Sequence, residues 1–273
     1  MTTAPTAGRL DTTFATLRAS GRRAIMPFVV GGHPDPKGLP ALLKAIDQAG
    51  ASVIEIGFPF SDPVADGPVI AEAMHRALAA GVTTRSVLEN VASSRSEIKA
   101  GLVAMISASL VHRSGGPAQF TREASKAGFD GCIFPDVSLE ESDPYVDACR
   151  EEGLGVSLLV APTTLPARAQ QIVRRCSGFV YVLARSGITG VSGGPPEIEH
   201  RVRELRAMTD LPLAVGFGIS TPEQVRAVTR HADAAIVGSA LVRRLGEAAS
   251  KGELAPEAAR AMVFTLAQGL GQA

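Results

Sequence analysis

Short apolar segments alternate with longer amphipathic segments along most of the chain. The apolar segments are rich in β-branched residues and nearly free of charge, which is the pattern of strands buried on both faces. The predicted strands are residues 24–30, 53–56, 102–106, 131–134, 156–160, 179–183, 213–215 and 234–237. Apolar positions three or four residues apart predict helices at residues 10–18, 37–49, 69–80, 84–98, 117–127, 139–152, 166–175, 196–208 and 222–229, with further helices at the C-terminal end.

Eight strand–helix units in succession predict an α/β fold, a (β/α)8 TIM barrel with an extra N-terminal helix. We find no Pro/Ser-rich linker that would divide the chain, so we expect a single barrel domain over residues 1–273. A doubly wound open sheet is the alternative, but the usual glycine fingerprint after the first strand is missing. Because barrel active sites lie on the loops that follow the strands, these loops hold the candidate residues.

The loop after the second strand carries an unusual set of carboxylates. The sequence from residue 51 to 68 is ASVIEIGFPFSDPVADGP, with Glu55 inside the strand and Asp62 and Asp66 in a loop stiffened by prolines. Strand alternation places Glu55 toward the barrel interior and Ile54 and Ile56 toward the helices. A buried carboxylate is costly unless it is used or paired. Two interpretations stay open: an acid/base site, or a buried salt bridge with turn-forming aspartates.

Glycine-rich loops follow the last three predicted strands and read ARSGITGVSGG, GFGIS and GSA. In barrels, the loops after strands seven and eight often bind phosphate through backbone N–H groups. Gly218, Gly238 and Ser239 are the candidate donors there, and Gly190 in the preceding loop could close over them. Tight turns built on these glycines are the alternative interpretation.

Composition narrows the classes of partner. Lysines plus arginines number 27 and aspartates plus glutamates number 27, and this balance argues against a nucleic-acid or anionic-membrane surface. No apolar run approaches the roughly 20 residues of a membrane span, and the N-terminus lacks the pattern of a secretion signal.

Three scattered cysteines fit reduced thiols in a cytoplasmic protein. The five histidines show no metal-ligand spacing, so we predict no metal; His33, which follows two glycines, is expected to border the site.

Several motifs together resemble the tryptophan synthase alpha chain family. They are, in chain order, PFVVGGHPDP, IEIGFPFSDPVADGP, PDVSLEES, YVLARSGITG, GFGIS and AAIVGSA. The resemblance extends over residues 14–270 and implies a (β/α)8 barrel that cleaves indole-3-glycerol phosphate to indole and glyceraldehyde 3-phosphate. It also implies a pyridoxal-phosphate beta chain as partner, in an alpha2beta2 heterotetramer, with no cofactor in this chain.

The resemblance also implies roles for individual residues. Glu55 and Asp66 match the catalytic carboxylates, and the phosphate-binding positions fall on Gly190, Gly218, Gly238 and Ser239. The implied indole pocket and lid comprise Phe28, Tyr181, Thr189 and Phe217. Pro59 and Asp62 match positions that face the beta chain.

This chain departs from the family pattern at two loops. Ser107 and Ser109 stand where the family often has an aromatic residue and an asparagine, and Ser138 replaces a proline. These loops lie near the implied active site and partner surface. Three other functions remain as alternatives: a different phosphate-binding barrel such as a sugar-phosphate isomerase, a free-standing indole-3-glycerol-phosphate lyase, and a non-catalytic subunit that activates a beta chain.

Overall fold

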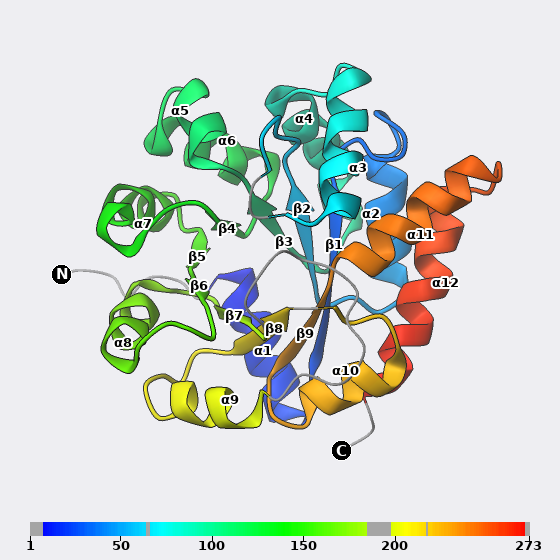
Figure 1. Cartoon of the computed structure of the whole chain (residues 1–273). Coiled ribbons are helices and arrows are strands. Elements are labelled where there is room, and N and C mark those ends of the chain that lie inside the picture. Colours follow the sequence, from blue (N-terminus) through cyan, green and yellow to red (C-terminus); the bar gives the residue numbers. More distant parts are fainter. Residues whose placement is uncertain (1–7, 64–65, 185–197, 217, 271–273) are drawn as a thin grey trace.

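The described strands form one parallel sheet that closes on itself. The computed structural model describes residues 8–63, 66–184, 198–216 and 218–270. Its strands run in the order β5-β4-β3-β2-β1-β9-β8-β7-β6, so β1 lies between β2 and the last strand (Figure 1). Their bounds are β1 Ala24–Val30, β2 Val53–Gly57, β3 Gly101–Met105, β4 Gly131–Ile133, β5 Gly155–Ser157, β6 Leu159–Val160, β7 Val180–Leu183, β8 Leu213–Gly216 and β9 Ala234–Val237. The expected barrel is confirmed.

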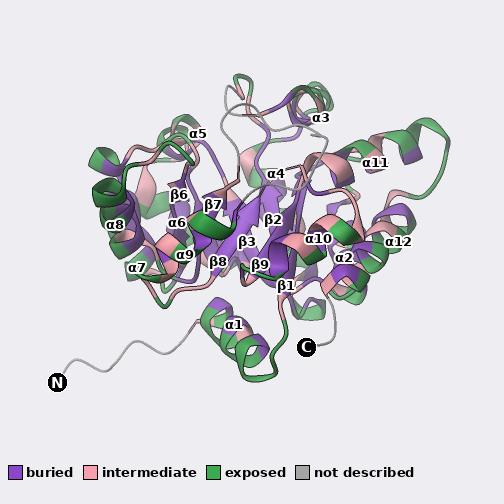
Figure 2. Ribbon diagram, turned by 60° about the horizontal axis from the view of Figure 1, so that its bottom comes forward, coloured by how far each residue is buried: buried purple, intermediate pink, exposed green. Residues whose placement is uncertain are grey.

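Helices surround this sheet and expose only their outer faces (Figure 2). Many have a proline in the first turn. Backbone N–H groups in the first turn have no acceptor within the helix, so proline, which lacks this N–H, costs no hydrogen bond there. Their bounds are α1 Arg9–Ala19, α2 Leu39–Gln48, α3 Pro68–Ala79, α4 Thr84–Ser94, α5 Ala108–Arg113, α6 Pro117–Ala127, α7 Asp143–Glu151, α8 Pro166–Arg175, α9 Glu199–Arg206, α10 Pro222–Thr229, α11 Ser239–Ser250 and α12 Ala255–Ala267. Short 3₁₀ turns occupy Arg95–Glu97, Leu139–Glu141 and Gln268–Leu270.

The buried apolar residues form two clusters, one between sheet and helices and one inside the barrel. The inner cluster joins Val53 of β2 and Phe179, which precedes β7, to Leu10 and Phe14 of α1. Helix α1 is the extra N-terminal helix (Figure 2). Glycines at the starts of neighbouring strands make room for Leu10: a Cβ atom at Gly101 would lie 2.7 Å from a Leu10 methyl carbon. Helix α1 thus closes the end of the barrel opposite to the loops that follow the strands.

The structure corrects the sequence prediction at two places. The single predicted strand at residues 156–160 is two strands, because β5 pairs with β4 whereas β6 pairs with β7. At the break, the Leu158 N–H donates to the sulfur of the Cys176 thiol at 3.3 Å rather than to a neighbouring strand. The second correction is α5, a six-residue helix that the hydrophobic pattern did not predict.

Candidate active site

Glu55 lies in the middle of β2 and points into the barrel. Its neighbour Val53 belongs to the inner cluster, while Ile54 and Ile56 belong to the outer one, so the predicted alternation is confirmed. The Glu55 side chain is fully buried, and both carboxyl oxygens lack a hydrogen-bond partner among the described residues. Burial raises the pKa of Glu55 to about 8. The described part of the chain supplies no cation to this carboxyl, which disfavours the salt-bridge interpretation.

Asp66 approaches the same region from the loop after β2. Its backbone N–H donates to the Pro63 carbonyl at 3.0 Å, and α3 begins two residues later at Pro68. Asp66 is half-buried, and burial raises its pKa to about 6. The pKa of Tyr181 is raised by burial and, in addition, by the negative charges of Glu55 and Asp66. These three side chains therefore share one electrostatic environment.

A narrow pocket of about 60 Å³ opens at the carboxyl ends of the strands. It brings together six of the predicted site residues: Phe28, Asp66, Tyr181, Gly218, Gly238 and Ser239. It also includes five residues that were not predicted: Ile70, Met105, Leu183, Gly216 and Ile236. Most of these five end a strand, and that position is the signal that could have identified them. Thr189, Gly190 and Phe217 lie outside the described residues.

The start of α11 forms one wall of this pocket and suits an anion. Gly238 is the residue before the helix, and no side chain caps the first-turn N–H groups within the described part of the chain. Uncapped N–H groups and the helix dipole together favour a negative ligand at this end. Gly218, on the neighbouring loop, has φ +60°, a conformation that side-chain-bearing residues rarely adopt. The geometry therefore supports the predicted phosphate-binding role of these glycines.

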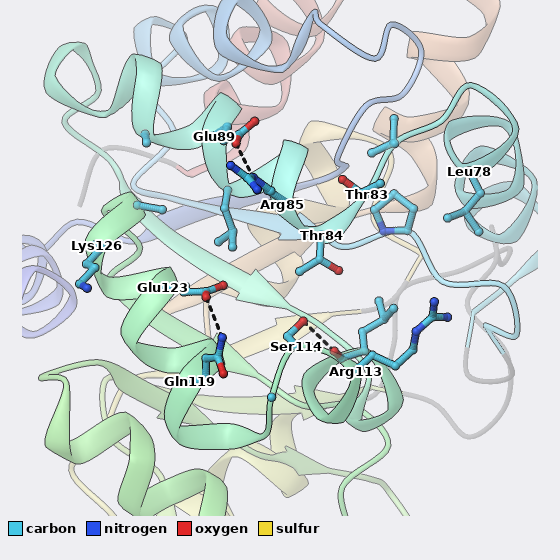
Figure 3. Close-up of a pocket in the computed structure, with 17 residues that line it drawn as sticks. Leu78, Thr83, Thr84, Arg85, Glu89, Arg113, Ser114, Gln119, Glu123 and Lys126 are labelled. Carbon is cyan, nitrogen blue, oxygen red and sulfur yellow. Dashed lines mark hydrogen bonds and ion pairs between the residues drawn. The ribbon is translucent and has the colours of Figure 1, made fainter.

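A much larger hollow, of about 960 Å³, lies outside the barrel between α4 on one side and α5 and α6 on the other (Figure 3). Arg85 pairs with Glu89 on α4, and Gln119 donates to Glu123 on α6. Pro59 lies at this hollow rather than in the inner pocket, and Asp62 is exposed. The inner pocket, not the larger hollow, is lined by Asp66, whereas the fully buried Glu55 is not among the residues that line either.

Comparison with known proteins agrees with this geometry. The family model described as tryptophan synthase alpha chain matches residues 14–270. The tryptophan synthase alpha chain of Phenylobacterium zucineum is 43% identical over 249 residues, which cover 91% of this chain and 90% of that relative. The chain belongs to the tryptophan synthase alpha chain family. It therefore has the family's place in tryptophan biosynthesis, that of a lyase acting on indole-3-glycerol phosphate.

Solved structures of the family have the same fold. The tryptophan synthase alpha subunit of Legionella pneumophila superposes with a TM-score of 0.89 at 32% identity, covering 97% of this chain and 99% of the other. A structure of Mycobacterium tuberculosis tryptophan synthase contains a chain that superposes with a TM-score of 0.87 at 34% identity, covering 97% of this chain and 99% of the other. The (β/α)8 architecture is thus shared by this chain and its relatives.

Two of the three serines that depart from the alpha chain family pattern have a structural role here. Ser107 precedes α5 and accepts a hydrogen bond from the Leu110 N–H at 3.4 Å, so it caps the short helix. Ser138 donates to Glu141 at 2.8 Å. Ser109 is exposed on α5, and nothing in the structure explains its identity.

Helices long and apolar enough to cross a membrane do not occur among the residues described. Over the same residues, no three His, Cys, Asp or Glu side chains lie close enough together to hold a metal ion.

Proposed function

We propose that Glu55 and Asp66 cleave indole-3-glycerol phosphate in the inner pocket, while Gly218, Gly238 and Ser239 bind its phosphate. One observation carries this assignment: Asp66 and an uncapped helix N-terminus line one pocket with Tyr181, whose pKa responds to the charges of both Asp66 and the buried Glu55. Burial raises the pKa values of both carboxyl groups. Pairs of carboxyls whose pKa values are separated by their environments are typical of acid/base sites. The phosphate end anchors the substrate, so that binding energy from this end orients the reacting carbons.

The bond to be broken defines what each carboxyl has to do. Cleavage of the carbon–carbon bond leaves its electron pair on indole C3, which is feasible once C3 has accepted a proton and the ring carries positive charge. Glu55, protonated at neutral pH, donates that proton to C3 and becomes a carboxylate. The Glu55 carboxylate then accepts the proton of the glycerol hydroxyl as the bond breaks, the electron pair neutralises the ring, and indole and glyceraldehyde 3-phosphate form. Glu55 ends the cycle protonated.

Asp66 has the complementary role. With a pKa of about 6 it is ionised at neutral pH, when Glu55 is still protonated. An ionised Asp66 accepts a hydrogen bond from the indole N–H and stabilises the positive charge that develops on the ring. Phe28 and Tyr181, both buried, supply the apolar walls against which the indole ring packs.

The proposal includes a partner and a location. The beta chain, which carries pyridoxal phosphate, receives the indole in an alpha2beta2 heterotetramer, with Pro59 and Asp62 on the face that meets it. Solved structures of tryptophan synthase that contain a chain similar to this one, such as that of Mycobacterium tuberculosis, support a beta-chain partnership. Three unpaired cysteines and balanced charge support a cytoplasmic location.

The direct test is indole release from indole-3-glycerol phosphate, measured with and without a beta chain. Release by the isolated chain that increases with the beta chain supports the proposal. High release with no response to the beta chain would favour the free-standing lyase. No release in either condition, together with activation of the beta reaction, would identify a non-catalytic subunit.

The phosphate site gives a prediction of its own. Gly238→Ala is expected to weaken glycerol 3-phosphate binding by about tenfold or more, because the added methyl group obstructs the approach of the anion to the N–H groups. The fold should survive, since the new Cβ would lie 3.8 Å from Phe28 and 3.9 Å from Ile70, ordinary contact distances. Calorimetry measures the affinity, and Ser250→Ala at the other end of α11 is the control. Unchanged affinity in folded Gly238→Ala would place the phosphate elsewhere.

A further inference from the structure

His33 is a buried side chain that the proposed chemistry does not use. It follows β1 and the glycine pair Gly31 and Gly32, and its backbone N–H donates to the Val30 carbonyl at 3.1 Å. Only 7% of the residue is exposed, and its Nε2 atom has no partner among the described residues. A buried polar ring in such a position calls for a structural or functional reason.

The ring of His33 contacts the first part of α11. It makes a hydrogen bond with the backbone carbonyl of Val242, and because Nε2 is unpartnered, Nδ1 is the donor. Val242 in turn donates its N–H to the Gly238 carbonyl at 3.1 Å, so the bonded carbonyl lies one turn from the phosphate site. Gly246, one turn further along, lies beside the ring: a Cβ there would be in ordinary contact with it, 3.6 Å from Nε2.

The same ring faces α3, the helix that begins two residues after Asp66. Glu72 and Arg76 on α3 lie near enough to affect the charge state of His33. Helices α3 and α11 run side by side (Figure 1). Between them is a cavity of about 410 Å³ whose lining includes His33, Ala73, Val242 and Gly246. His33 therefore lies where the helix that follows Asp66 meets the helix that begins at the phosphate site.

We propose that His33 is a positioning residue that fixes the first turns of α11, and with them the phosphate-binding N–H groups, relative to β1 and α3. The inference rests on the proposed function, since it assumes that Gly238 and Ser239 bind the phosphate. Its physical basis is the bond from a loop anchored on β1 to a carbonyl in the first turn of α11. A small displacement of those N–H groups is enough to weaken charge-assisted hydrogen bonds that depend on distance and angle.

Two variants and two ligands test the role. His33→Ala is expected to weaken glycerol 3-phosphate binding by about tenfold, while the affinity for indole, which makes no use of the phosphate site, changes by less than about twofold. His33→Asn keeps an N–H donor near the position of Nδ1 and should recover most of the lost affinity. Calorimetric titration of each folded variant with each ligand measures these differences.

The cavity beside His33 allows a chemical rescue. Imidazole added to His33→Ala can enter from the cavity between α3 and α11 and should restore glycerol 3-phosphate affinity toward that of the unaltered protein. Val173→Ala is the matched control, because it removes a buried contact in α8, on another side of the barrel, and lowers stability without touching α11. The control variant should bind glycerol 3-phosphate normally and should not respond to imidazole.

The outcomes separate this inference from the function on which it rests. If the unaltered protein binds glycerol 3-phosphate and His33→Ala binds it equally well, His33 has no positioning role and the proposed site stands. The inference would also be overturned if His33→Ala lost affinity for glycerol 3-phosphate and indole equally, or if Val173→Ala lost affinity for glycerol 3-phosphate as well. Either result would mean that the variant acts through general destabilisation. Failure of the unaltered protein to bind glycerol 3-phosphate would overturn both proposals.

Discussion

Glu55→Gln is expected to lower the turnover of indole-3-glycerol phosphate by at least about a hundredfold, the usual consequence of losing a general acid/base. Glutamine has nearly the size of glutamate, so the pocket keeps its shape, but the amide neither donates a proton to indole C3 nor accepts one from the hydroxyl. Substrate affinity should be largely retained, because the phosphate site and the indole walls are unchanged. Steady-state measurement of indole release gives both quantities.

The matched control is Glu257→Gln, which removes an exposed carboxylate from the first turn of α12. It should turn over substrate at the rate of the unaltered protein. Near-normal turnover by Glu55→Gln itself would refute the assignment of Glu55 as the acid/base group.

Glu55→Gln also tests the raised pKa of Glu55, through the pH dependence of the free energy of unfolding. Glu55 has a pKa of about 8 in the folded protein against an ordinary value of 4.5. Between these pH values the folded state binds more protons than the unfolded state, so Glu55 lowers the free energy of unfolding as pH rises. Glu55→Gln lacks this effect and should be more stable than the unaltered protein by about 2–4 kcal/mol at pH 8, with the difference vanishing below pH 4.5. Urea denaturation at both pH values measures it; a constant difference would mean that Glu55 has an ordinary pKa.

The strands and most helices were predictable because their signals are local. Strand residues buried on both faces are uniformly apolar, and β1 and β9 begin and end where the pattern predicted. Thr83 and Thr221 cap the following helices through short-range hydrogen bonds, and proline opens several others.

Helix α5 was missed because contacts from distant segments hold it in place. Its six residues are too few for a reliable periodic signal. The Ala108 N–H donates to Asp136 at 2.9 Å, and the hydroxyl of Tyr145 bonds to His112 at 3.1 Å. Both partners lie about 30 residues away in the sequence, so no local pattern reveals them.

In the candidate site, too, some features follow from local sequence and others depend on contacts between distant segments. The inward direction of Glu55 follows from alternation along one strand and was predictable. Closure of the barrel decides which strand ends meet, and for that reason Met105, Leu183 and Ile236 were not identified as lining residues. The pKa values of Glu55 and Asp66 depend on burial and on which partners are nearby, and both are properties of the folded protein alone.

The pocket in this structure is too small for the whole substrate. Its volume of about 60 Å³ holds only a few water molecules, and Glu55 lies fully buried beside it. Turnover therefore requires a wider, competent state of this pocket. A partner accelerates the reaction if it binds this competent state better than the contracted one.

We expect an added beta chain to raise indole production by roughly one to two powers of ten, equivalent to about 1–3 kcal/mol of coupling. The loop after β2 is the route we propose, because it carries exposed Asp62 together with Asp66, whose N–H bonds to Pro63 in the same loop. Docking on Asp62 would thereby shift Asp66 toward the competent arrangement. Asp62→Ala should remove much of the stimulation and leave the basal rate nearly intact.

The decisive measurement is turnover at saturating substrate, titrated with the beta chain of the same organism. Glu257→Gln is again a suitable control, since Glu257 is an exposed carboxylate outside the loop after β2 and should leave the stimulation unchanged. A flat titration with high basal turnover would identify a free-standing lyase. Full stimulation of Asp62→Ala would show that the beta chain acts through another surface, and the hollow between α4 and α6, where Pro59 lies, would be the next to mutate.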